Sequence, residues 1–279
     1  LNTQKRSLLA PAFLCMTFAI VFKSNNSVIL VAAIMILLLN AFRNKDWYAL
    51  IFAAMLFLGP SLASLGINSY YASTSGLEQI PDGIPKVAWI AMGLQENDYI
   101  ENGWYNGYNW NIYTENHFDS AAAAQASIQS IQESVARFFS APKSGLHFFY
   151  KKFISQWNDP GFQSQITNEW YSRHRDDHSP LALYLIYGNG RILLENIMNF
   201  YHFIVLLGGS IYAFFSLREK KLSSTLLSLC IFGGYFFHLI WEAGGRYGLG
   251  YFVLCVPLAA WGLQKLTDIL INQFQKLQQ

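Results

Sequence analysis

The sequence predicts an all-α, polytopic membrane helix bundle of about six transmembrane helices, with one large and mainly helical extracytoplasmic loop domain. Of the 279 residues, 53% are hydrophobic and only 13% are charged, against roughly a quarter charged in ordinary soluble domains. Six apolar stretches approach the roughly 20 residues that a helix needs to cross a bilayer. The net charge of +2 comes without a long run of Lys or Arg, so no nucleic-acid partner is expected.

Basic residues in the short loops predict how the six stretches are oriented. The stretches cover approximately residues 7–22, 27–42, 47–65, 196–217, 223–241 and 248–266. Lys and Arg cluster before the first stretch, between the second and third, between the fourth and fifth, and near the end of the chain. These are alternate loops, and such clusters accumulate on the cytoplasmic side. Both termini are therefore predicted inside, with residues 66–195 outside the cytoplasmic membrane.

Three parts follow from this path. Residues 1–65 form three N-terminal transmembrane helices, residues 66–195 form the extracytoplasmic loop domain, and residues 196–279 form three C-terminal transmembrane helices with a cytoplasmic tail.

Two helices are predicted inside the loop domain. Asp119 or Ser120 is placed to cap a helix that ends near residues 141–142, because apolar side chains recur at helical spacing after it. The segment 146–157 mixes aromatic residues with Lys151 and Lys152, which is typical of an amphipathic helix at the lipid headgroups.

The stretch HLIWEAGGRYGLGYF, residues 238–252, carries two opposite charges in an apolar region. Two glycines between Glu242 and Arg246 are predicted to break the fifth span at the outer edge of the membrane, where exposed backbone N–H groups and the guanidinium could hold a phosphate. Ionisable groups at membrane depth are costly and are candidates for function. The alternative is a salt bridge that only closes a turn between two helices.

The stretch GWYNGYNWNIY, residues 103–113, is rich in Asn, Tyr and Trp. Aromatic faces stack on sugar rings and amides bond hydroxyls, so this composition suits a carbohydrate, and it suits a well-ordered turn-rich loop equally. Just before it, Glu96, Asp98 and Glu101 could serve as a general base, bind a divalent cation or be solvated loop carboxylates.

Other chemistries are not indicated. The cluster RHRDDH, residues 173–178, matches no zinc spacing and is interpreted as a solvated charge run. The sequence contains no Walker-type loop, G-x-S-x-G elbow or H-E-x-x-H motif, which excludes the hydrolase classes that depend on them. No definite cofactor is predicted, and a divalent cation stays an open alternative.

Four segments together resemble a known family. PKVAWIAMGLQ, GWYNGYN and SQWNDPGFQS lie in the loop, and WEAGGRYGLGYFVLCVPLAA follows in the last spans. In this combination the chain resembles bacterial GT-C membrane glycosyltransferases, most of all the protein mannosyltransferase and aminoarabinose transferase group. The resemblance covers the chain from about residue 47 onward.

The resemblance implies an activity and partners. Such enzymes take a sugar from a polyprenyl-phosphate carrier and attach it, outside the bacterial cytoplasmic membrane, to a glycopolymer, lipid or protein. By this resemblance Arg246 binds the carrier phosphate, and Tyr247 and Glu242 shape that pocket. Sugar and acceptor are implied to contact residues of the external loop, namely Trp104, Tyr105, Asn106, Tyr108, Asn109 and Glu101.

The resemblance also implies what this sequence lacks. GT-C enzymes place a catalytic carboxylate in the first external loop, whereas the corresponding loop here, residues 23–26, has none. Since the chain also starts with Leu1, we expect it to be the C-terminal portion of a longer enzyme, and we assign no catalytic base in it. Alternatives are a non-catalytic lipid-linked-sugar binding protein or flippase, and a polymerase or ligase of lipid-linked oligosaccharides.

Overall fold

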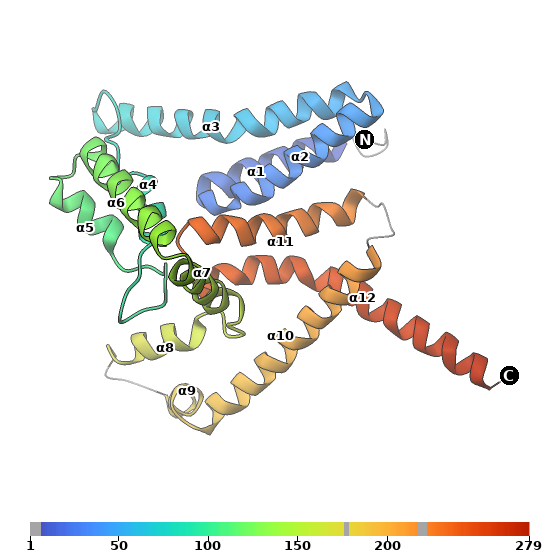
Figure 1. Ribbon diagram of the computed structural model, residues 1–279. Coiled ribbons are helices and arrows are strands. Elements are labelled where there is room, and N and C mark those ends of the chain that lie inside the picture. Colours follow the sequence, from blue (N-terminus) through green and yellow to red (C-terminus); the bar gives the residue numbers. More distant parts are fainter. Residues whose placement is uncertain (1–6, 176–178, 217–221, 279) are drawn as a thin grey trace. The chain divides into compact units, whose positions relative to one another are not determined.

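The computed structural model describes residues 7–175, 179–216 and 222–278, which form helices and contain no β-strand. The all-α class is therefore confirmed. Along the chain the helices are α1 (Leu9–Phe22), η2 (Ser24–Asn26), α2 (Ser27–Asn44), α3 (Trp47–Ser75), α4 (Val87–Gly93), α5 (Tyr108–Glu115), α6 (Ser120–Ser140), α7 (Pro142–Trp157), α8 (Ser164–Ser172), α9 (Pro180–Ile186), α10 (Asn189–Ser216), α11 (Leu222–Ile240) and α12 (Gly245–Leu277) (Figure 1).

Four of these helices are long and apolar enough to cross a membrane, which indicates an integral membrane protein. They cover Ser24–Asn44, Trp47–Ser75, Asn189–Ser216 and Gly245–Leu277, while Leu9–Phe22 and Thr225–Ile240 are apolar but shorter. All six predicted stretches are thus helical in the described residues, and the number of spans stays a prediction. Helix α3 continues beyond the predicted end at residue 65, and α10 begins before residue 196, so both extend into the segment predicted as the loop domain.

The chain divides into two compact units. The first consists of Leu1–Gly83 with Leu222–Gly234, and in it α1, α2 and α3 pack side by side (Figure 1). Helix α3 begins where the Asp46 carboxylate accepts a hydrogen bond from the backbone N–H of Tyr48 (3.1 Å). Large apolar side chains such as Phe22 and Phe57 remain exposed, as expected of helices that face lipid rather than water.

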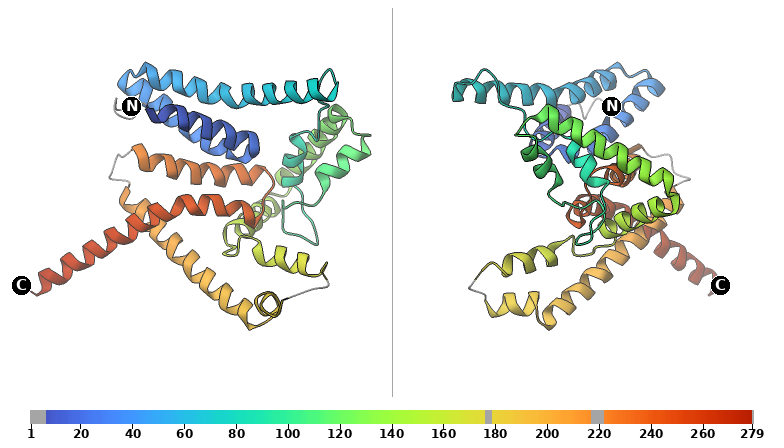
Figure 2. Two further views of the ribbon diagram at one scale, coloured as in Figure 1. Left: turned by 180° about the vertical axis from the view of Figure 1, so that it is seen from behind. Right: turned by 60° about the vertical axis from the view of Figure 1, so that its left-hand side comes forward.

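The second unit, Ile84–Lys221 with Tyr235–Gln279, contains the close crossing of α10 and α12, which is seen in Figure 1 and from behind in the left view of Figure 2. Glycine allows this approach: a Cβ atom at Gly208 would lie 2.6 Å from the backbone oxygen of Ala259. Small residues at a helix crossing let two backbones pack directly, which is the usual means of association between helices in lipid. This crossing fixes the position of α12, whose first turn carries Arg246.

Both helices predicted in the loop are present. Helix α6 covers Ser120–Ser140, and the Asp119 carboxylate caps it by accepting hydrogen bonds from the backbone N–H groups of Ala121 (2.8 Å) and Ala122 (3.1 Å). Helix α7 covers Pro142–Trp157. Of its two lysines, Lys151 is exposed and Lys152 is buried, so they do not lie together on one solvated side.

Candidate functional site

The candidate site surrounds the turn between α11 and α12. Helix α11 ends at Ile240 and α12 begins at Gly245, so the predicted break at the two glycines is confirmed. The turn places Glu242 and Arg246 one helical turn apart, with a carboxylate-to-guanidinium distance of 3.5 Å.

Glu242 and Arg246 differ sharply in exposure. The Glu242 side chain is 5% exposed, whereas that of Arg246 is 57% exposed. The Tyr247 hydroxyl donates to the Glu242 carboxylate (3.0 Å) and accepts from the Arg246 guanidinium (3.1 Å). Burial raises the pKa of Glu242, and the Tyr247 hydroxyl and the Arg246 charge oppose that increase. The Glu242 carboxylate is therefore a buried partner of Tyr247 and Arg246. The Arg246 guanidinium keeps much of its surface accessible to a ligand.

Lys152 of α7 holds this turn in place through hydrogen bonds to its backbone. Its side chain is 1% exposed, and its ammonium donates to the backbone oxygens of Leu239 (3.0 Å), Trp241 (2.8 Å) and Gly93. These oxygens lie at or just beyond the C-terminal ends of α11 and α4, where unpaired carbonyl groups favour a cation. Burial lowers the pKa of Lys152 from 10.5 to about 7, and attraction to the Glu242 carboxylate opposes the decrease.

The aromatic stretch reaches the same turn through its backbone. Trp104 and Ala243 form an isolated parallel β-bridge, in which the Ala243 N–H donates to the Gly103 oxygen (2.8 Å). Gly103 has a φ of 69°, and a Cβ atom there would lie 2.5 Å from the Gly93 oxygen and 2.6 Å from the Lys152 Cε. Only glycine fits this position, so the GWYNG segment is held against both the turn and Lys152.

Two further residues of α7 bond the aromatic stretch and the turn. Ser155 accepts a hydrogen bond from the Trp104 indole N–H (3.0 Å). Buried Gln156 accepts one from the Gly244 N–H (3.3 Å) with its side-chain oxygen. The Ala243 and Gly244 N–H groups are both bonded inside the protein, so these two do not serve a ligand as the sequence predicted. Arg246 and Lys151 are the cationic side chains of the cavity described next.

A cavity of about 550 Å³ opens between the aromatic stretch and the turn. It brings together five of the predicted site residues. Trp104 and Tyr105 come from the aromatic stretch, Glu101 precedes it, and Glu242 and Arg246 come from the stretch 238–252. The remaining lining residues are Asn97, Asp98, Tyr99, Ile100, Asn102, Lys151, Gln163, Ile166 and Ala243.

The other predicted sugar-contacting residues lie elsewhere. Asn106 and Tyr108 line a separate hollow of about 240 Å³, and Asn109 is buried, where its side-chain oxygen accepts from the Trp110 N–H (2.9 Å). Asn109 therefore has a structural role in the first turn of α5. Glu96 lines neither the cavity nor the hollow.

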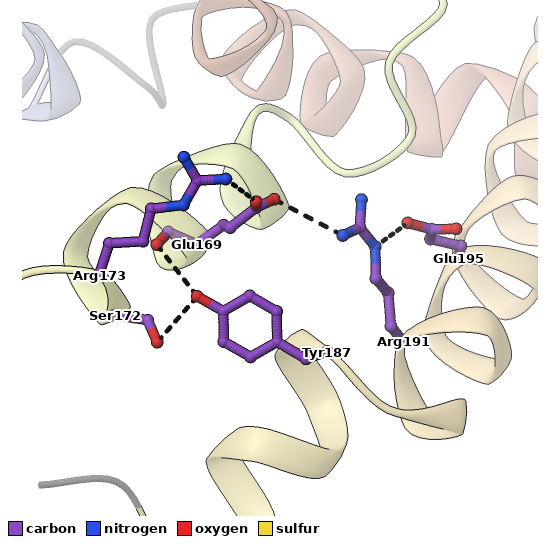
Figure 3. A network of polar contacts seen from close by, with 6 residues as sticks. All are labelled: Glu169, Ser172, Arg173, Tyr187, Arg191 and Glu195. Atoms are coloured by element: carbon purple, nitrogen blue, oxygen red, sulfur yellow. Dashed lines mark hydrogen bonds and ion pairs between the residues drawn. The ribbon is translucent and has the colours of Figure 1, made fainter.

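Arg173, the first residue of the RHRDDH segment, belongs to a network of polar contacts. Arg173 pairs with Glu169 of α8, Arg191 of α10 lies 3.6 Å from the second Glu169 oxygen and 2.8 Å from Glu195, and the Tyr187 hydroxyl lies 3.2 Å from the Ser172 hydroxyl (Figure 3). Residues 176–178 lie outside the described residues. In the part of the chain that the structure describes, no three His, Cys, Asp or Glu side chains gather as they would around a metal ion.

Comparison of the chain with protein-family models, with curated proteins and with solved structures finds no match. The evidence on function is therefore the site itself. Sequence reasoning missed Lys152 and Gln156, the two buried polar residues that position the turn. The available signal was their spacing of four, which continues the buried series of Gly145 and Phe148 along one side of α7.

Proposed function

We propose that the protein is a membrane glycosyltransferase that moves a sugar from a polyprenyl-phosphate carrier to a cell-envelope acceptor on the extracytoplasmic side of a bacterial cytoplasmic membrane. The observation that carries the proposal is the position of Arg246. Its half-exposed guanidinium lines a cavity of about 550 Å³ at the first turn of α12, a helix long and apolar enough to span a membrane. A lipid tail beside α12 would bring its phosphate to this cation.

The remaining walls suit the sugar of such a donor. Trp104 and Tyr105 offer aromatic surface, and Asn97 and Asn102 offer amides that exchange hydrogen bonds with hydroxyl groups. Lys151 adds a second cation to the lining. A ligand with one anionic end and one hydroxyl-rich end matches this distribution of charged, amide and aromatic groups.

The proposed reaction forms a bond between an acceptor hydroxyl oxygen and the anomeric carbon of the sugar. The bond from that carbon to the phosphate oxygen breaks, and the phosphate keeps the electron pair. A fixed guanidinium where this negative charge develops lowers the barrier, and one such donor typically accounts for about a hundredfold or more in rate. The proton of the acceptor hydroxyl passes to a carboxylate, and Asp98 and Glu101 are exposed carboxylates that line the cavity.

The test is turnover of a radiolabelled polyprenyl-phosphate sugar by the purified full-length protein. Release of the free carrier phosphate with transfer of one sugar supports the proposal. Transport of the intact donor across vesicles without cleavage would identify a flippase instead, and transfer of a whole chain would identify a polymerase or ligase.

Arg246→Ala tests the phosphate assignment. We expect kcat/KM to fall about a hundredfold with little change in unfolding temperature, because the Tyr247 hydroxyl still bonds Glu242. Arg173→Ala is the matched control, since it removes a guanidinium that is 67% exposed and lies outside the cavity. Equal turnover by Arg246→Ala and the wild type would refute the assignment.

A further inference from the structure

A second hollow is lined mainly by polar side chains. It has a volume of about 240 Å³ and is lined by Gln95, Asn106, Tyr108, Asn111, Ile112 and Glu115. Four of these six side chains carry an amide or a carboxylate, and the hollow lies at α5 and the segment that precedes it. Its chemistry differs from that of the main cavity, because no Lys or Arg lines it.

Part of this lining is held in place. The Asn106 amide donates to the Gln95 side-chain oxygen (3.0 Å), and the Gln95 amide donates to the Ser130 hydroxyl of α6 (3.3 Å). Asn106 also accepts from the Tyr108 N–H (2.9 Å), which fixes the start of α5. The orientation of these amides is therefore set before any ligand arrives, which lowers the entropic cost of binding.

The side chains of Asn111 and Glu115 are available to bind a ligand. Within the described residues, the side chains of Asn111 and Glu115 have no hydrogen-bond or ion-pair partner in the protein. They are four residues apart on α5 and so lie on the same side of that helix. An amide with both donors and acceptors and a carboxylate that accepts are suited to hydroxyl groups, and the carboxylate repels an anion.

We propose that this hollow binds an uncharged saccharide unit of the acceptor, so that the acceptor of the proposed transferase is a carbohydrate of two or more units. The inference rests on the proposed function. Tyr105 lines the main cavity and Asn106 lines the hollow, and likewise Asn97 and Gln95 lie on the two sides. The same continuous segment therefore forms part of both pockets, and in this proposal one unit of the oligosaccharide occupies the hollow while another enters the cavity.

Saccharide binding is measured directly and without donor. Saturation-transfer NMR on the purified full-length protein uses maltose, cellobiose, mannobiose and chitobiose as probes, with sodium glucuronate as the anionic control. We expect at least one neutral disaccharide to bind and glucuronate not to bind. Absence of binding by all four disaccharides overturns the inference, as does preferential binding of glucuronate.

Variants locate the binding to the hollow. Asn111→Ala and Glu115→Ala should each weaken the affinity for the bound disaccharide roughly tenfold, the effect of one lost hydrogen bond of about 1.4 kcal/mol. Thr114→Ala is the matched control on the same helix, since Thr114 bonds only backbone oxygens of α5 and lies outside the hollow. Equal affinity in all three variants overturns the inference.

Failure of this inference and failure of the proposed function are distinguishable. The disaccharide experiment contains no donor, and donor cleavage is assayed with Arg246→Ala. If donor is cleaved but no disaccharide binds, only the saccharide acceptor is refuted. If disaccharide binds in the hollow but no donor is cleaved, the transferase proposal fails and the hollow remains a carbohydrate site.

Discussion

Replacing Lys152 by Met should loosen the turn between α11 and α12. The ammonium donates to three backbone oxygens, those of Gly93, Leu239 and Trp241, and at 1% exposure of Lys152 water cannot easily replace it. Met keeps most of the apolar chain but donates no hydrogen bond. With roughly 1 kcal/mol for each buried carbonyl left without a donor, the loss is about 3 kcal/mol, or a fall of roughly 5–10 °C in unfolding temperature.

The stabilisation should also depend on pH, in a direction that the Lys152 pKa fixes. Burial holds the pKa of Lys152 at about 7 in the folded protein, against 10.5 in its ordinary state. Between these values the unfolded chain binds more protons than the folded one, so the free energy of unfolding rises with pH. The slope is at most about 1.4 kcal/mol per pH unit. Lys152→Met lacks this contribution, and the difference between wild type and variant should grow from pH 7 to pH 10.

The assay is thermal unfolding in detergent, followed by tryptophan fluorescence from pH 6.5 to 9.5. The adjacent exposed lysine supplies the control: Lys151→Met makes the same substitution on the same helix and should change the free energy of unfolding by less than about 0.5 kcal/mol. The reasoning is refuted if Lys152→Met unfolds at the wild-type temperature across this pH range, or if the two variants behave alike.

Two further predictions concern the elements around the site. Gly208→Ala should destabilise the protein by about 1–3 kcal/mol, since its Cβ atom would lie 2.6 Å from the Ala259 oxygen; Gly250→Ala, also within a helix but with no neighbour within 4 Å, should be neutral or slightly stabilising, and equal effects on unfolding temperature would contradict the close crossing. Asp119→Ala should cost about 1 kcal/mol by removing the cap of α6, and an unchanged unfolding temperature would show that the cap contributes nothing.

Local signals in the sequence were sufficient for several elements. The capping residue Asp119 and the apolar spacing that follows predicted α6, and the structure has its end at Ser140. The glycine pair predicted a break between the last two spans, and α11 ends at Ile240 while α12 begins at Gly245. In each case the cause acts within a few residues of its effect, which is why sequence is enough to see it.

The role of α7 could not be predicted in the same way. The mixture of aromatic residues with Lys151 and Lys152 predicted an amphipathic helix, but it did not indicate that Lys152 and Gln156 are buried. The reason is tertiary: the carbonyl ends of α4 and α11 converge and require a donor. The helical spacing of Gly145, Phe148, Lys152 and Gln156 marks a buried side of α7, but it does not show that distant segments require a donor at position 152.

The aromatic stretch shows a related limit. Its composition indicated carbohydrate binding as one interpretation. Composition does not reveal which side chains line the cavity, which line the hollow and which are buried. Trp104 and Tyr105 line the cavity, Asn106 turns into the hollow, and Asn109 is buried within α5. Gly103, at the start of the stretch, has a positive φ and accepts a hydrogen bond from the Ala243 N–H, a contact with a distant turn that composition does not reveal.

The arrangement around Glu242 explains how Arg246 could serve a ligand while belonging to an ion pair. Removing the partner of a buried charge is usually costly, because the charge is left uncompensated. Here the Tyr247 hydroxyl is nearer to the Glu242 carboxylate (3.0 Å) than the guanidinium is (3.5 Å), and the charge of Lys152 also favours the carboxylate. Glu242 therefore keeps support when Arg246 moves toward a phosphate. On this argument Tyr247→Phe should weaken phosphate binding although Tyr247 need not touch the ligand, because the guanidinium would then be held more tightly by Glu242. Unchanged affinity for free polyprenyl phosphate in that variant would refute it.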